Sequence, residues 1–433
     1  MIGGLSQLAL ATAVRFGTGV FIFVFAARQW SPEQFGQFMY CFSIASLFVL
    51  CADLGFAQQV LKDVGANPAR LSAKLCRFFA AKVWLTVVVL LGALGLSLLT
   101  HSSFPGQLIL VMALVVAGCA GTFSELLFQT MRAVGRYGDE MRISLWTNGG
   151  AVVSFATVLT LGGTPITLAL TFMVVRILQL GLVDRGCALA WFNLPRFVAC
   201  TRPRRVINTI RHGQAYAYEV MVMAALTNVD TILVARIAGY SQAGIYQAAA
   251  RLSQGVGIAF SVVAGYFLPK LANAQRSGEG SVRITSRLFI VAAGISVVLV
   301  IAFWLAAQYY NLQKPGSVMI QAVPILYGFA GLVMLRLFSG ALAILLTAQG
   351  RQTLRATLYL CALAFFILSA SVLVPVIGIW GALGAYFISY SILAIGFAYF
   401  SDTPLRLVVF GAAILLILSS AAVILFVYNK YAE

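Results

Sequence analysis

Charged side chains are scarce in this sequence. Asp, Glu, Lys and Arg make up 9% of its 433 residues, whereas apolar residues make up 61%, and the mean hydropathy is +0.96. The surface of a soluble domain carries far more charge than this. The composition therefore excludes a string of soluble domains and predicts a polytopic membrane protein.

Motifs that support catalysis or metal binding are also missing. None of the seven cysteines forms a CxxC pair, and the sequence contains neither an HExxH motif nor a Walker loop. The two histidines, His101 and His212, are expected at opposite faces of the membrane, where they cannot act together. We therefore expect no cofactor, no metal site and no enzymatic activity.

Long apolar runs fill most of the chain. A helix needs about 20 mostly apolar residues to cross the hydrocarbon core of a bilayer. Thirteen segments meet this requirement: 5–27, 37–61, 79–100, 107–130, 143–162, 165–183, 213–237, 243–268, 288–307, 318–347, 354–375, 378–400 and 407–428. We expect an all-α polytopic membrane protein with 12–13 transmembrane helices.

The basic residues predict how these segments are oriented. Twenty Lys and Arg residues fall in alternate connecting loops, and only four fall in the opposite set. Because cytoplasmic loops are enriched in Lys and Arg, the N-terminus is expected in the cytoplasm. The net charge of +17 is therefore largely topological, and no nucleic-acid partner is needed to explain it.

The longest and most basic loop, 184–212, separates six segments from the next six. The two halves share a local pattern, because Arg28, Gly36 and Phe38 recur as Arg236, Gly244 and Tyr246 at a constant offset of 208 residues. Internal repeats of this kind are common in transporters. We expect two six-helix bundles related by a pseudo-two-fold axis, 1–200 and 201–404, followed by an additional transmembrane helix in 405–433.

Nine ionisable residues fall inside the predicted membrane segments, where a charge costs about 3 kcal/mol. They are Arg15, Lys82, Arg176, Arg251, Arg336, Asp53, Glu125, Glu219 and Asp230. Lys82 is close to the start of its segment, so its ammonium is expected to snorkel to the membrane surface. Glu125 is equally consistent with a structural contact at a helix end.

The other four cations are expected to face a water-filled interior. Arg15, Arg176, Arg251 and Arg336 are too far from the ends of their segments to snorkel easily. Guanidinium groups bind phosphate through paired hydrogen bonds. We therefore interpret these four residues as a candidate cavity site for an anion that carries a phosphate group.

The acidic residues in the predicted membrane segments can be interpreted in two ways. Glu219 and Asp230 are eleven residues apart, so in one continuous helix they lie on nearly the same face, about 16 Å apart along the axis. Together with Asp53, they are candidates either for balancing the cavity arginines or for coupling transport to an ion gradient. Candidates for contact with a sugar are Gln58, Gln247, Gln254 and Tyr216.

Short motifs occur in both halves of the sequence. Residues 28–38 read RQWSPEQFGQF and residues 53–56 read DLGF. In the second half, residues 228–233 read NVDTIL, followed by GIY at 244–246 and AARL at 249–252. These motifs resemble the O-antigen flippase (Wzx-like) family of polysaccharide-biosynthesis membrane proteins, within the multidrug/oligosaccharidyl-lipid/polysaccharide (MOP) exporter superfamily.

This resemblance implies a V-shaped pair of six-helix bundles in a bacterial inner membrane. It implies a protein that flips an undecaprenyl-pyrophosphate-linked oligosaccharide from the cytoplasmic to the periplasmic face, with cationic cavity residues on the pyrophosphate. Arg15 and Arg251 occupy suitable places for that role. The expected partners are the lipid-linked oligosaccharide, membrane lipids and a polysaccharide polymerase complex.

Two other functions remain open at this stage. A multidrug exporter of organic cations belongs to the same superfamily, but it would favour an acidic and aromatic cavity. A membrane glycosyltransferase or polymerase would need catalytic acids or a sizeable outward loop, and Glu33 is the only acid in the outward loops.

Overall fold

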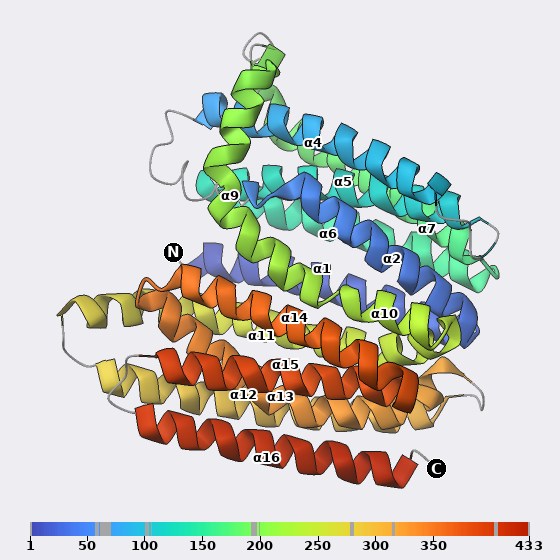
Figure 1. The fold of residues 1–433 in the computed structure, drawn as a ribbon. Coiled ribbons are helices and arrows are strands. Elements are labelled where there is room, and N and C mark those ends of the chain that lie inside the picture. Colours follow the sequence, from blue (N-terminus) through green and yellow to red (C-terminus); the bar gives the residue numbers. More distant parts are fainter. Residues whose placement is uncertain are drawn as a thin grey trace. The chain divides into compact units, whose positions relative to one another are not determined.

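The computed structural model describes residues 2–56, 60, 71–99, 104, 106–191, 197–198, 200–277, 281–313, 317–401 and 406–431. These residues are helical almost throughout and contain no β-strand (Figure 1). Eleven of their helices are long and apolar enough to cross a membrane. The all-α, multi-span architecture predicted from hydropathy is confirmed.

Each predicted segment contains helical structure among its described residues. The helices of the first half are α1 (Ile2–Gln29), α2 (Pro32–Asp53), α4 (Leu71–Leu99), α5 (Gln107–Ala133), α6 (Tyr137–Thr160), α7 (Pro165–Trp191) and α9 (Pro203–Leu226). Those of the second half are α10 (Val229–Ile237), α11 (Tyr240–Ser277), α12 (Ser281–Asn311), α13 (Val318–Ala348), α14 (Gln352–Ile377), α15 (Ile379–Phe400) and α16 (Arg406–Tyr431).

The helices form two compact units. Unit 1 comprises Met1–Gln29 and Phe38–Asn228, and unit 2 comprises Trp30–Gln37 and Val229–Glu433. The first turns of α2 are therefore grouped with unit 2 and the rest of that helix with unit 1. The boundaries expected at 200/201 and 404/405 stay a prediction.

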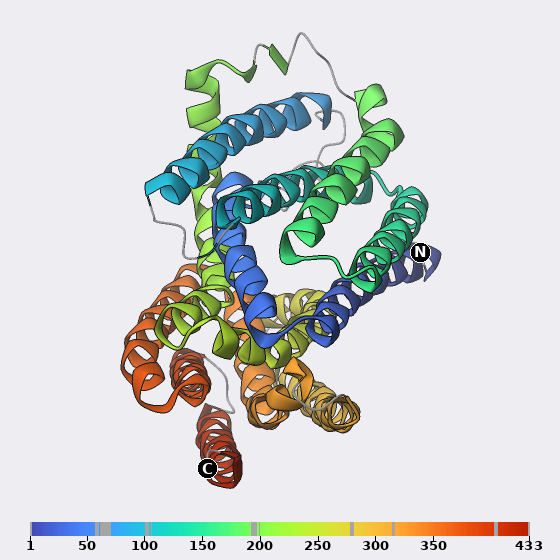
Figure 2. The same ribbon diagram turned by 90° about the vertical axis from the view of Figure 1, so that its right-hand side faces the viewer.

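Each unit is built around one central helix. In unit 1, α5 packs against α4, α6 and α7, while α1 packs against α6 and α9 against α4. In unit 2, α13 packs against α11, α12, α14, α15 and α16, and Figure 2 shows the same helices turned by 90°, with α16 in dark red at the C-terminus. Most residues in the apolar stretches of α5 and α13 are buried, as expected for helices that lie among several neighbours.

The helix α2 ends earlier than its predicted segment 37–61. After Asp53 the backbone turns into the left-handed region at Leu54 (φ 43°) and Gly55 (φ 70°). Such a pair of residues ends an α-helix, and glycine adopts this conformation without steric cost. As a result Asp53 occupies a helix terminus, where its carboxylate reaches a neighbouring helix.

The seventh predicted segment, 213–237, is broken into α9 and α10. The side chains of Thr227 and Asn228 both donate hydrogen bonds to the carbonyl oxygen of Ala224, at 3.0 Å and 2.8 Å. Such bonds from a side chain to the preceding turn compete with continuation of the helix. The expectation of one continuous helix with Glu219 and Asp230 on a single face is therefore wrong.

Candidate functional site

Arg15 of α1 lies in a network of polar side chains within unit 1. Its guanidinium donates to Glu125 Oε2 (3.1 Å), to Glu140 Oε1 (2.7 Å) and to Ser144 Oγ (2.9 Å and 3.0 Å). The carbon at the centre of the guanidinium also lies 4.0 Å from the ring centroid of Phe128. Arg15 is thus held by two carboxylates, one from α5 and one from α6.

A second arginine shares the same acids. Arg132, in the last turn of α5, donates to both carboxylate oxygens of Glu140 at 2.6–3.1 Å, and its Nη1 lies 3.8 Å from Glu125 Oε1. Gln129 donates to Glu125 at 2.8 Å. Glu140 itself is fully buried, so a full charge is removed from solvent there and compensated by two guanidinium groups.

Sequence reasoning missed Glu140, Arg132 and Ser144 as parts of this network. Hydropathy placed residues 131–142 in a loop, whereas Arg132 lies in the last turn of α5 and Glu140 in the first turn of α6. An available signal was the position of Glu140, because acidic residues are favoured in the first turn of a helix. That signal predicts a helix start but does not identify Arg15 as a partner.

Lys82 is fully buried and forms an ion pair with Asp53. Its ammonium also donates to the carbonyl oxygen of Thr122 at 2.8 Å. The expectation that Lys82 snorkels to the membrane surface is wrong, because α4 begins at Leu71, well before the predicted segment start at residue 79. The ammonium therefore lies inside unit 1, and the terminus of α2 supplies its counter-charge.

Arg176 of α7 has a neutral partner. Its Nη1 donates to Gln179 Oε1 at 2.7 Å, and Gln179 is buried. Among the described side chains, no carboxylate forms an ion pair with Arg176, although Arg15 and Glu125 lie within its electrostatic reach. Arg176 is therefore a cation of unit 1 whose charge is not matched by an adjacent acid.

A buried carboxylate organises unit 2. Asp230 of α10 is 1% exposed, and its two oxygens accept four hydrogen bonds. The Oδ2 atom accepts from the hydroxyls of Tyr246 (3.0 Å) and Tyr386 (3.1 Å), and Oδ1 accepts from the backbone and the hydroxyl of Thr231 (2.6 Å and 3.0 Å). The side chain of Gln247 donates to the Thr231 hydroxyl. These bonds tie α10 to α11 and α15.

Two arginines accompany this carboxylate. Arg336 of α13 donates to the carbonyl oxygen (3.1 Å) and the hydroxyl (3.0 Å) of Ser253, and its guanidinium carbon lies 5.2 Å from the ring centroid of Tyr390. Arg251 of α11 is within electrostatic reach of Asp230. The structure thus brings Arg251, Arg336, Asp230 and Gln247 together in one unit.

The structure does not describe the side chains of four other predicted site residues. Gln58 lies outside the described residues, and only the helical backbone is described for Tyr216, Glu219 and Gln254. Glu219 belongs to α9 in unit 1 and Asp230 to α10 in unit 2, so their predicted pairing along one helix does not hold. No group of three potential metal ligands is found in the described ranges.

The eleven candidate spans and the ionisable side chains inside the helical units define a polytopic, all-α membrane protein, in which such side chains are expected to mark functional sites. Comparison with known proteins assigns it more closely. The chain belongs to the polysaccharide biosynthesis protein family, whose model matches residues 3–275. Among curated proteins no match is found.

Several solved structures share the fold. They include the lipid II flippase MurJ in an inward closed conformation, with a TM-score of 0.67 and 12% identity over 98% of this chain and 99% of that chain. The MATE multidrug transporter DinF-BH has a TM-score of 0.63 and 13% identity over 97% and 95% of the chains. A MATE structure in complex with MaL6 has a TM-score of 0.61 and 13% identity over 96% and 95%. The chain therefore shares the helical fold of these flippase and transporter structures.

Proposed function

We propose that this protein is a flippase for an undecaprenyl-pyrophosphate-linked glycan, such as an O-antigen or another surface polysaccharide unit. It moves the lipid-linked oligosaccharide from the cytoplasmic to the periplasmic leaflet of a bacterial inner membrane by alternating access. Family membership supports a role in polysaccharide assembly. The distribution of basic loops supports a cytoplasmic N-terminus.

The observation that carries the proposal is an excess of positive charge inside each unit. In unit 1 the cations Arg15, Arg132 and Arg176 accompany the acids Glu125 and Glu140, and the side chain of Glu219 is not described. Lys82 and Asp53 neutralise each other in a separate pair. The described side chains of this cluster therefore carry one positive charge more than negative charges.

Unit 2 shows the same imbalance. Among the side chains described in unit 2, Arg251 and Arg336 accompany the carboxylate of Asp230. A pyrophosphate diester is an anion, so an excess of positive charge in each unit suits it. Low-dielectric surroundings strengthen the attraction of such clusters for an anion, and an anionic lipid head is therefore favoured over an organic cation.

The four candidate arginines have unequal roles in this proposal. Arg176 and Arg251 are the first candidates for pyrophosphate contact, because Arg176 has a neutral partner and Arg251 is one of two cations that accompany Asp230. Arg15 forms ion pairs with Glu125 and Glu140, so it is proposed to contribute to the electrostatic potential of the site and not to contact the substrate. Arg336 is committed to Ser253 and is proposed to reach the substrate only when α11 and α13 shift.

Asp230 is proposed as the site that couples transport to a proton or sodium gradient. It is a carboxylate held by four hydrogen bonds inside unit 2. Protonation of Asp230, or binding of a cation to it, would weaken the bonds from Tyr246 and Tyr386 and release α10 from α15. Asp53 is engaged with Lys82 and is proposed to balance charge, while Glu219 stays a second coupling candidate.

A reconstituted transport assay tests the function. Purified protein in vesicles is supplied with a labelled undecaprenyl-pyrophosphate oligosaccharide, and label reaching the opposite leaflet is measured over time. Arg176→Gln and Arg251→Gln should each reduce the rate at least tenfold, whereas Arg142→Gln, which removes an exposed cation of unit 1, should leave it unchanged. Export of organic cations without movement of the lipid-linked glycan would assign the protein to the multidrug exporters instead.

A further inference from the structure

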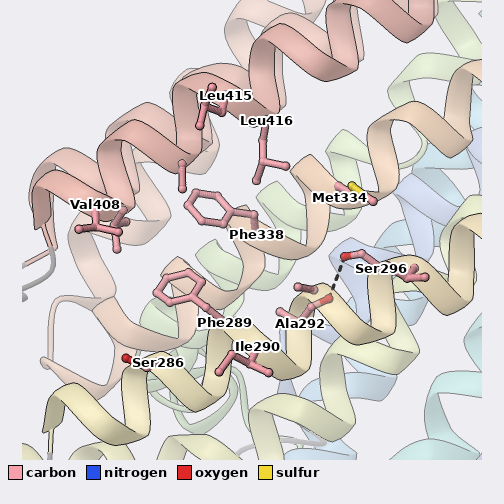
Figure 3. Close-up of a pocket in the computed structure, with 14 residues that line it drawn as sticks. Ser286, Phe289, Ile290, Ala292, Ser296, Met334, Phe338, Val408, Leu415 and Leu416 are labelled. Carbon is pink, nitrogen blue, oxygen red and sulfur yellow. Dashed lines mark hydrogen bonds between the residues drawn. The ribbon is translucent and has the colours of Figure 1, made fainter.

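An elongated groove lies along α16 in unit 2. Two cavities, of about 560 Å³ and about 490 Å³, are both lined by α12, α13 and α16. In the first, the side chains of Phe289, Phe338 and Leu416 point into the same space (Figure 3). Met334 of α13 lines both cavities and therefore marks the point where one ends and the other begins.

Each cavity is about as deep as one leaflet. The second cavity follows α16 from Ser419 to Lys430, and the first follows α12 from Ser286 to Val297. Eleven residues of α-helix rise about 16 Å, which is close to half of the ~30 Å hydrocarbon core. The groove thus divides near mid-membrane, at Met334, into two compartments of leaflet depth.

The outer end of the second cavity has the chemistry of a membrane interface. Aromatic side chains from all three helices gather there: Trp304, Tyr327 and Tyr431. The rings of Tyr327 and Tyr431 are stacked with centroids 6.5 Å apart, and Lys430 Nζ lies 5.2 Å from the Tyr431 centroid. Tyr and Trp mark the headgroup level of a bilayer, so Lys430 is a cation placed where lipid phosphates lie.

We propose that this second cavity is a binding site for an anionic phospholipid, with one acyl chain between α12 and α16 and the phosphate at Lys430. The apolar walls match a hydrocarbon chain, and the exposed ammonium matches an anionic headgroup. The division at Met334 limits the occupant to a chain of one leaflet. This inference does not depend on which substrate the protein transports.

Photo-crosslinking tests the site. Full-length protein in nanodiscs is exposed to phosphatidylglycerol that carries a diazirine on one acyl chain, and to phosphatidylcholine with the same chain and diazirine. Phosphatidylglycerol should label α12 and α16 along the stretches of these two helices that line the second cavity. It should do so about fivefold more strongly than phosphatidylcholine, as expected for one surface cation.

Two matched pairs of variants sharpen the test. Val300→Trp fills the second cavity and should abolish labelling there, whereas Val298→Trp changes an exposed residue of the same helix that lines neither cavity and should not. Lys430→Gln should remove the preference for phosphatidylglycerol, and Lys430→Arg should retain it. Thermal unfolding of each variant shows that the fold is intact.

Three results would overturn the inference. The first is equal labelling by the two phospholipids together with no effect of Lys430→Gln. The second is labelling that Val300→Trp leaves unchanged in a protein of normal thermal stability. The third is displacement of phosphatidylglycerol by an equimolar amount of undecaprenyl phosphate. This result would show that the groove binds the carrier lipid in preference to a phospholipid.

Discussion

The backbone of Gly36 packs directly against the backbone around Gly244. A Cβ atom on Gly36 would lie 1.7 Å from the carbonyl oxygen of Tyr240, and one on Gly244 would lie 2.1 Å from the carbonyl oxygen of Pro32. Because 32 and 36 precede 240 and 244 by the same 208 residues, the contact is reciprocal, as at a two-fold axis. It lies within unit 2, which includes Trp30–Gln37.

This reciprocal contact predicts a strict requirement for glycine. Gly36→Ala or Gly244→Ala forces two backbones apart, so each should destabilise the protein by at least the ~1–3 kcal/mol typical of overpacking. Gly17→Ala is the control, because open space surrounds that helical glycine and alanine there favours the helix. Thermal unfolding in detergent measures the effect, and equal midpoints for Gly36→Ala and Gly17→Ala would contradict the predicted clash.

The buried Lys82–Asp53 pair predicts a non-additive pattern of stability. Lys82→Met leaves the Asp53 carboxylate without its counter-charge, and Asp53→Leu leaves the buried ammonium bonded to the Thr122 carbonyl oxygen but without its carboxylate partner. Each single change should cost about 3–5 kcal/mol, while the double change should cost much less, since apolar residues replace the pair. Thermal unfolding of all four proteins completes the cycle, and a double variant less stable than either single variant would refute this account.

The network around Arg15 predicts different effects for its two acids. Glu140→Gln removes the buried charge that binds both Arg15 and Arg132, so it should reduce stability by roughly 3–5 kcal/mol. Glu125 is 41% exposed, so Glu125→Gln should cost no more than ~1 kcal/mol. Protein abundance in membranes and the unfolding midpoint report both effects, and a larger loss for Glu125→Gln would show that Glu140 is not the main anchor.

The buried carboxylate of Asp230 predicts that two substitutions in unit 2 affect different properties, one the dependence of transport on the ion gradient and the other the stability of the fold. Asp230→Asn removes the charge that a proton or sodium ion would neutralise, so transport should lose its dependence on the ion gradient. Tyr386→Phe deletes only one of the four hydrogen bonds, so it should lower stability by ~0.5–1.5 kcal/mol and keep the dependence. Transport is measured with and without an ion gradient for each variant. If Asp230→Asn responds to the gradient as the unmodified protein does, Asp230 is not the coupling residue.

The break between α9 and α10 predicts that Glu219 and Asp230 act independently. They belong to different helices and different units, so the effects of Glu219→Gln and Asp230→Asn on unfolding should be additive within ~0.5 kcal/mol. A double-variant cycle measures the coupling energy. A value well above that limit would show that the two acids share a partner.

The sequence alone predicted the broad architecture well, because hydropathy reflects the solvent in which a segment is stable. Each apolar run contains a helix, and the matched positions of the repeat pair Gly36 with Gly244, which pack together in the structure. The predicted site was less complete. It included Arg15 but missed Glu140, because a helix that extends beyond its apolar run carries charged residues that hydropathy assigns to a loop.

Composition, period and charge distribution thus determined that this protein is an all-α membrane protein with two similar halves, since these properties depend on each residue's own preference for lipid or water. Which charges are neutralised was decided only by tertiary structure. Lys82 and Asp53 lie 29 residues apart in the chain and Asp230 and Tyr386 lie 156 apart, so their pairing depends on helix ends and packing angles that bring distant segments together.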